Sequence, residues 1–185
     1  MTEELIVEKC KAGDKKAFAF LYNTYAPKML GVCFRYAKSR EEAEDMLQEG
    51  FIKLFQKIDT FKGSGSFEGW MRRVIVNTAI NYYKTQIKYN STLNVENSDL
   101  TFVENDHSEN SSGSDIPQNK LLEMIQQLPE GYKMIFNLYV MDGYTHQEIS
   151  EILNISINTS KSQLFKARNM LRTKVEEYRK QQVLI

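Results

Sequence analysis

Apolar residues recur every three or four positions along most of this chain, which is the spacing that places side chains on one face of an α-helix. Asp14 is a suitable N-cap for a helix that Pro27 is expected to interrupt or restart. Ser39 and Glu42 form a capping box at the start of the next helix, which is predicted to reach Ile58. Apolar and polar residues never alternate over a sustained stretch, so we expect almost no β-strand.

A loop rich in glycine and serine, Gly63–Ser66, precedes a long helix that is predicted from about Phe67 to Lys88. The side chains of this helix that are expected to face inward are Trp70, Met71, Val74, Ile75, Thr78 and Tyr82. Basic and aromatic residues are interleaved around the loop. Basic charge attracts phosphates and flat rings stack on unpaired bases, so the segment suits single-stranded nucleic acid better than a duplex groove. The alternative is that most of these rings belong to the core.

The helix that starts after Ser39 carries an unusual number of carboxylates in its first turns, namely Glu41, Glu42, Glu44, Asp45 and Glu49. Negative charge near a helix N-terminus complements the helix dipole, which is one explanation for the pattern. The other is an acidic face that docks on a basic protein partner. The residues by themselves leave both explanations open.

The stretch between Lys88 and Lys120 contains no basic residue, and its six acidic residues lie among Asn, Ser and Gly. Such a composition buries too little apolar surface to offset the entropy of ordering the chain. We therefore expect a flexible acidic linker at about 91–117. It would join two all-α domains, at 1–90 and 118–185.

The stretch from Tyr144 to Val175 predicts a helix-turn-helix. Thr145 and Glu148 form a capping box, and Asn154 suits the left-handed residue of the turn. The second helix is expected to be capped by Asn158 or Thr159 and to bury Leu164, Ala167, Leu171 and Val175. Its basic residues are Lys161, Lys166, Arg168, Arg172 and Lys174. A basic recognition helix of this kind indicates duplex DNA binding, while the alternative is an antiparallel helix pair with a solvated basic face.

Composition excludes several other classes of protein. The 24 basic and 24 acidic residues balance, so any contact with DNA must come from local patches. Cys10 and Cys33 lack metal-ligand spacing and lie on apolar helical faces, which predicts buried thiols and no metal site. Neither a signal peptide nor a long apolar run is present, so we expect a cytoplasmic protein without membrane insertion. No motif of an enzyme, a cofactor site or a small-molecule substrate site stands out.

Three segments and their order resemble a known family. The segments AEDMLQEGFIKLFQKI, FKGSGSFEGWMRRVIVNTAINYY and LPEGYKMIFNLYVMDGYTHQEISEILNISINTSKSQLFKAR are similar to regions 2 and 4 of extracytoplasmic-function (group 4, sigma-70 family) sigma factors of bacterial RNA polymerase. With the opening CKAGDKKAFAFLYNTY, the resemblance covers nearly all of the chain except the linker. It implies a factor that directs core polymerase to promoters, and it implies an anti-sigma protein as a partner.

The resemblance also assigns roles to single residues. It implies contact with the β′ clamp helices of polymerase by Asp45, Met46, Gln48, Glu49 and Phe51. It implies capture of the melted minus-ten strand by Lys62, Gly63, Ser64, Gly65, Ser66 and Asn77. Contacts with the minus-35 element would come from Lys161, Ser162, Phe165 and Lys166. The rest of the second domain would lie on the polymerase β flap.

Two positions in the helix-turn-helix depart from the family pattern. Ser160 stands where an apolar residue usually packs, which suggests a looser or shifted turn, and Gln163 stands where arginine is frequent. The rival interpretations of the whole chain are a stand-alone helix-turn-helix transcription regulator with an N-terminal helical sensing or interaction domain, and a helical adaptor that binds only protein.

Overall fold

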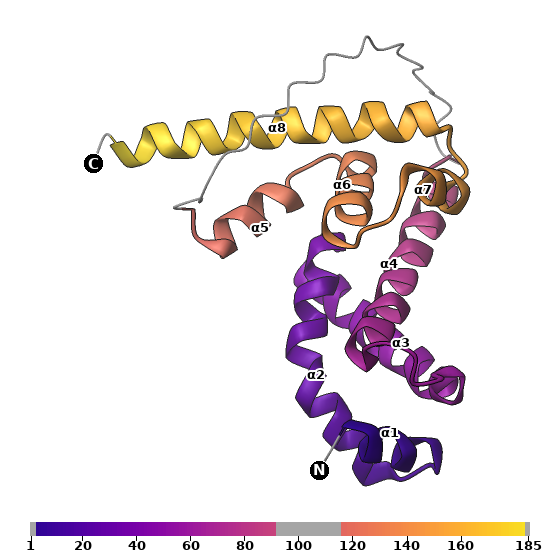
Figure 1. Ribbon diagram of the computed structural model, residues 1–185. Coiled ribbons are helices and arrows are strands. Elements are labelled where there is room, and N and C mark those ends of the chain that lie inside the picture. The colour runs from indigo at the N-terminus through magenta and orange to yellow at the C-terminus, as the bar shows by residue number, and fades with distance from the viewer. Residues whose placement is uncertain (1–2, 92–115, 184–185) are drawn as a thin grey trace. The chain divides into compact units, whose positions relative to one another are not determined.

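The computed structural model describes residues 3–91 and 116–183, and within these ranges it contains helices and no β-strand. The chain divides into two compact units, Met1–Tyr89 (unit 1) and Asn90–Ile185 (unit 2), whose helices are labelled in Figure 1. The prediction of an all-α fold is confirmed. Most of the stretch for which an acidic linker is predicted, residues 92–115, lies outside the described residues.

Unit 1 consists of α1 (Glu3–Lys11), α2 (Lys15–Tyr36), α3 (Arg40–Lys57), the short 3-10 helix η1 (Ile58–Thr60) and α4 (Phe67–Ser91). The long helices α2 and α3 pack against each other, and α1 contacts both α2 and η1. Side chains from all four α-helices form the core, including the fully buried Cys10, Leu21, Met29, Cys33, Leu54, Phe67, Met71 and Ile75.

The predicted N-caps of unit 1 are confirmed, but the capping box at Ser39 is only half formed, because the carboxylate of Glu42 accepts a hydrogen bond from the backbone N–H of Lys38. The carboxylate of Asp14 accepts a hydrogen bond from the backbone N–H of Lys16 at 2.8 Å, and the hydroxyl of Ser39 accepts one from Glu42 at 3.2 Å. These bonds satisfy backbone donors that have no partner inside the helix. The starting points of α2 and α3 are thus determined by residues next to them in the chain.

The expectation that Pro27 interrupts the second helix is wrong, because α2 continues through it to Tyr36. Proline removes one helical hydrogen bond, which would join its nitrogen to the carbonyl of Asn23. Both residues are exposed, so water can satisfy that carbonyl. Burial of Leu21 and Met29 on the opposite face holds the helix together on either side of the proline.

A close approach of α3 and α4 depends on Gly50. A Cβ atom at this position would collide with Cδ1 of Ile75, which is itself fully buried. Glycine therefore lets the side chain of Ile75 lie directly against the backbone of α3. This contact helps to determine which face of α4 is turned toward the core.

Unit 2 consists of α5 (Gln118–Gln126), α6 (Glu130–Phe136), a π-helical turn η2 (Asn137–Met141), α7 (His146–Leu153) and α8 (Ile157–Val183). The helix α8 contacts α5, α6 and α7, and Figure 1 shows it as the longest ribbon of this unit. Ile135, Leu138, Ile149 and Ala167 are fully buried, and Leu164 is nearly so. Burial is thereby confirmed for Leu164 and Ala167, whereas Leu171 and Val175, also predicted to be buried, are half-buried.

The turn between α7 and α8 has the predicted geometry with one difference. The capping box of Thr145 and Glu148 is present, and Asn154 is left-handed with φ 55°. The next helix begins earlier than predicted, since Ser156 and not Asn158 or Thr159 occupies the cap: its hydroxyl accepts a hydrogen bond from the backbone N–H of Thr159 at 2.9 Å. Serine is as good a cap as asparagine or threonine, so local preference alone did not distinguish these positions.

Leu54 and Ile52 provide a matched test of the core of unit 1, since Leu54 is fully buried whereas 57% of Ile52 is exposed. We expect Leu54→Ala to lower the free energy of unfolding by about 2 to 5 kcal/mol, because it removes buried methyl groups and leaves a cavity. Ile52→Ala should change it by less than about 0.5 kcal/mol. Urea unfolding followed by helical circular dichroism measures both, and equal effects would contradict the assignment of the two faces of α3.

Candidate functional site

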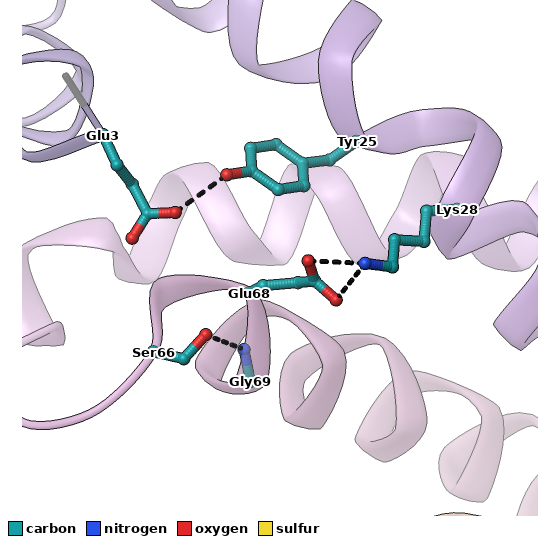
Figure 2. Close-up of polar contacts among 6 residues, drawn as sticks. All are labelled: Glu3, Tyr25, Lys28, Ser66, Glu68 and Gly69. Carbon is teal, nitrogen blue, oxygen red and sulfur yellow. Dashed lines mark hydrogen bonds and ion pairs between the residues drawn. The ribbon is translucent and has the colours of Figure 1, made fainter.

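The loop between η1 and α4 projects into solvent. Its five residues, Lys62–Ser66, are all exposed, and we call them the Gly-Ser loop. Gly63 and Gly65 have φ of 74° and 91°, values that side-chain-bearing residues rarely adopt. At its end the hydroxyl of Ser66 accepts a hydrogen bond from the backbone N–H of Gly69 at 3.3 Å, as Figure 2 shows. The glycines therefore shape the loop, and the serine starts α4.

An aromatic cluster lies beneath the loop. The ring of Phe61 is 5.1 Å from that of Phe67 and 5.5 Å from that of Trp70, and Phe67 and Trp70 stack at 5.6 Å. The residue before the loop is thus in contact with residues after it, which closes the loop at its base. Phe67 is fully buried, so the cluster belongs partly to the core.

The predicted inward face of α4 is only partly correct. Met71, Ile75 and Thr78 are buried, but Trp70, Val74 and Tyr82 are half-buried. Four buried residues of α4 were not among those predicted to face inward, namely Phe67, Val76, Ala79 and Ile80. The buried stripe follows four-residue steps from Phe67, and this places Trp70 at its edge. A repeat of three or four residues defines a stripe, but only packing against α2 and α3 decides where its centre lies.

The opposite face of α4 is exposed and begins at the Gly-Ser loop. Its exposed positions follow one another at intervals of three or four residues: Ser66, Gly69, Arg73, Asn77, Asn81, Lys84 and Lys88. Asn77 therefore shares a continuous face with the loop, as its predicted role requires. Arg73 and Asn81 lie one turn to either side of it and were not among the predicted site residues, although the same count of helical spacing finds them.

The acidic face of α3 contains some of the predicted residues and excludes others. Asp45 and Gln48 are exposed, and Glu49 is half-buried and pairs with Lys53. Met46 and Phe51, which were also predicted to contact a partner, are 3% and 2% exposed. Their side chains belong to the core of unit 1.

Ile52 was missed by the sequence reasoning. It is an apolar residue with 57% of its surface exposed, and it follows Asp45 and Gln48 at helical spacing. Charged and apolar groups thus occur together on this face, a combination common in protein interfaces.

The first turns of α8 present the predicted recognition residues to different degrees. Lys161 is exposed, and Phe165 is 40% exposed. Ser162 is half-buried and donates a hydrogen bond to the carbonyl of Thr159 at 3.1 Å. The ammonium of Lys166 lies 5.9 Å from the ring centroid of Tyr132, an attractive cation–π contact. Lys161 and Phe165 are therefore presented most fully.

Ser160 does not loosen the turn, contrary to the expectation from the family pattern. It is fully buried, and its hydroxyl lies 2.8 Å from Nδ1 of His146. The imidazole stacks on Tyr139 at 4.3 Å, and the guanidinium of Arg168 lies 5.9 Å from the same ring. Burial, then the charges of Lys161 and Arg168, lower the pKa of His146. A polar pair thus takes the place of an apolar contact between α7 and α8.

The two cysteines are the other potentially reactive side chains, and their surroundings indicate structural roles. Cys10 and Cys33 are buried and form no disulfide, and burial raises the pKa of the Cys33 thiol to about 12. Such a thiol is a poor nucleophile because the thiolate is the reactive form. Among residues 3–91 and 116–183, no group of His, Cys, Asp and Glu could hold a metal ion. No helix in these ranges is long and apolar enough to cross a membrane.

Comparison with known proteins accounts for both units. Residues 21–88 match the family model described as Sigma-70 region 2, and residues 118–171 match Sigma-70, region 4. The ECF RNA polymerase sigma-E factor of Haemophilus influenzae is 33% identical over 186 residues, covering 95% of this chain and 96% of that protein. The chain belongs to the extracytoplasmic-function sigma factors of the sigma-70 family.

Further relatives of this sigma factor agree. The RNA polymerase sigma-H factor of Pseudomonas aeruginosa is 30% identical, covering 91% of each chain. The solved structure of the sigma factor RpoE in complex with the anti-sigma factor NepR, from Bartonella quintana, aligns with a TM-score of 0.51 and 19% identity, over 88% of this chain and 98% of that one. CnrH, solved in complex with the cytosolic domain of CnrY, aligns at 0.50 and 14%, over 94% and 96%. At these identities the solved structures show a shared fold.

The lowered pKa of His146 predicts how the stability of the second unit of this sigma factor depends on pH. An unfolded histidine takes up a proton near pH 6.5, whereas the folded imidazole does so only at lower pH. The contribution of His146 is therefore fully present above about pH 6.5 and is lost as the pH falls toward the folded pKa. The protection factors of amides in α7 and α8, which are exchange rates corrected for the intrinsic slowing of exchange at lower pH, should fall as the pH drops below about 6.5. His146→Gln should flatten this dependence, and an unchanged slope would contradict the assignment.

Proposed function

We propose that this sigma factor directs core RNA polymerase to promoters through three separate surfaces. Residues 1–90 act as region 2, which docks on polymerase and captures the melted minus-ten strand, and residues 118–185 act as region 4, which reads the minus-35 element. Residues 91–117 connect the two. The observation that carries this proposal is the exposed face of α4, which runs without a break from the Gly-Ser loop to Asn77.

The minus-ten surface consists of the loop Lys62–Ser66 and Asn77. An unpaired base needs a site that combines positive charge with groups that match its polar edge. Lys62 and Arg73 supply the charge, and the amide of Asn77 offers both a donor and an acceptor. Positive φ at Gly63 and Gly65 turns the loop tightly, so a base can approach its backbone without meeting side chains at those positions.

The polymerase surface is the exposed acidic face of α3. Asp45 and Gln48 are exposed and Glu49 is half-buried, which suits a basic helical partner such as the β′ clamp helices. Ile52 adds an apolar contact to this face. Met46 and Phe51 are omitted because they are buried.

The minus-35 surface lies on the first two turns of α8. Lys161, Ser162, Phe165 and Lys166 are assigned to it, with Lys161 and Lys166 as phosphate or base contacts and Phe165 as an apolar contact. Burial of Leu164 and Ala167 against the rest of unit 2 supports this orientation of the helix. The remainder of unit 2 would lie on the β flap.

The proposal assigns no catalytic residue and no cofactor to the chain, and it places the protein in the cytoplasm with polymerase. An anti-sigma protein that covers these surfaces is part of the proposal. It is supported by the solved relative RpoE, whose complex contains the anti-sigma factor NepR.

Reconstitution with core polymerase tests the function directly. We expect transcripts with defined 5′ ends when core enzyme, this chain and genomic DNA are combined, and none when either protein is omitted. Sequencing of the 5′ ends measures this. A stand-alone regulator would instead shift duplex DNA in the absence of polymerase and would produce no start sites with core enzyme, a result that would refute the proposal.

Two substitutions should separate docking from strand capture. Asp45→Lys places a like charge opposite a basic partner, so it should lower affinity for core polymerase by about tenfold or more. Asn77→Ala should leave that affinity unchanged but reduce open complexes, measured by permanganate reactivity of unpaired thymines. Asp59→Lys is the control, since Asp59 is exposed in η1 and lies off the α3 face. Equal loss of core binding in Asp59→Lys would show that net charge, not the α3 face, is responsible.

A further inference from the structure

Both ends of the Gly-Ser loop are attached to helices that precede it in the chain. On the first side, the ammonium of Lys11, at the end of α1, donates a hydrogen bond to the backbone carbonyl of Phe61 at 2.7 Å. Phe61 immediately precedes the loop, and its ring packs on Phe67 and Trp70. Lys11 therefore holds the backbone at the point where the chain leaves the core and enters the loop.

On the other side of the loop, a lysine of α2 holds the first turn of α4. The ammonium of Lys28 lies 2.7 Å from each carboxylate oxygen of Glu68, as Figure 2 shows. Glu68 comes two residues after Ser66, the last residue of the loop. In the same view Ser66 and Gly69 form the hydrogen bond that starts α4.

A hydrogen bond also joins α1 to α2 close to the ion pair of Lys28 and Glu68. The hydroxyl of Tyr25 donates a hydrogen bond to Glu3 at 2.9 Å, and the edge of its ring faces Phe67 at 6.2 Å. Burial, the hydrogen bond to Glu3 and the charges of Glu3 and Glu68 raise the pKa of Tyr25 to about 12. Figure 2 shows this hydrogen bond beside the ion pair of Lys28 and Glu68, so α2 is joined both to α1 and to the start of α4.

The loop itself has little that would hold it in one conformation. A Cβ atom built on Gly63 or Gly65 meets no other atom within 4 Å, and all five loop residues are exposed. Glycine also has more backbone freedom to lose than any other residue. A loop of this kind binds tightly only if its conformation is restricted before binding, and contacts at its two ends are the available means.

We propose that Lys11 and Lys28 are positioning residues for the Gly-Ser loop, and that they act through the carbonyl of Phe61 and the carboxylate of Glu68. The proposal rests on the proposed role of the loop in capturing unpaired promoter DNA. The pairing of Lys28 with both oxygens of Glu68 neutralises its charge locally, so its contribution is to the position of α4 and not to phosphate binding. Lys11 and Glu3 lie before residue 21, where the match to Sigma-70 region 2 begins.

The first experiment uses Trp70, the one tryptophan in the chain, which lies against Phe61 and Phe67. We expect Lys28→Met, Glu68→Gln and Lys11→Met each to raise the acrylamide quenching constant of Trp70 in the free protein by about two- to fivefold, the range that an exposed polar contact supports. Lys11→Arg and the reversed pair Lys28→Glu with Glu68→Lys should restore the original value. Lys16→Met removes another exposed lysine of α2 and serves as the control. Unchanged quenching in all variants would overturn the positioning role.

The second experiment measures open complexes with reconstituted polymerase on the promoters found by transcript mapping. Each single variant should lower permanganate reactivity of the unpaired thymines by about two- to fivefold. Core binding should stay constant, and the reversed pair should restore opening. If Lys28 instead contacts phosphate, Glu68→Gln will not impair opening and the reversed pair will not rescue it, which would overturn the proposal. Altered quenching with normal opening would refute the role of the loop in strand capture while leaving its attachment in the free protein intact.

Discussion

Burial of one face of α4 in the core of unit 1 determines which residues of that helix lie on its exposed face. Phe67, Met71 and Ile75 lie in the core of unit 1, and Gly50 lets Ile75 approach the backbone of α3. Since an α-helix turns by about 100° per residue, fixing this stripe also fixes Asn77 on the exposed side. The Gly-Ser loop is attached to the same helix through Ser66, so the loop and Asn77 are held in one frame. Without that packing, nothing in the two residue types would place the Gly-Ser loop and Asn77 on the same exposed face.

In unit 2 as well, burial of one face of a helix decides which residues stay exposed, and here the buried face includes a polar residue. Leu164 and Ala167 turn the inner face of α8 toward the other helices, and this leaves Lys161 and Phe165 outside. Ser160 lies on the inner side, where an unpaired hydroxyl would be costly. Its contact with His146 satisfies both groups and ties the start of α8 to the start of α7. A directional hydrogen bond specifies the register of two helices more narrowly than an apolar contact of the same size.

The charges of the chain balance overall, but acidic and basic residues are concentrated on different helices. Carboxylates gather on the first turns of α3, while residues 157–175 of α8 contain five basic residues and no acidic one. Opposite charges on separate surfaces allow one neutral protein to meet a basic protein and an acidic nucleic acid. The ion pair of Lys28 and Glu68 differs from both patches, because it joins elements of the same unit.

The sequence by itself determined the helical class, most helix boundaries, the capping box of Thr145 and the family, because these follow from residues close together in the chain. It also predicted roles for Asn77, the Gly-Ser loop and Lys161 that require them to be exposed, as they are. Only the tertiary structure decided that Met46 and Phe51 are buried, that Trp70 lies at the edge of the core, and that α2 continues through Pro27. It alone revealed the bond between Ser160 and His146 and the attachment of the loop by Lys11 and Lys28. The spacing of apolar residues predicts which positions share a helix face, but it does not determine the rotation of each helix about its own axis to better than a fraction of a turn. Contacts between residues distant in sequence fix that rotation.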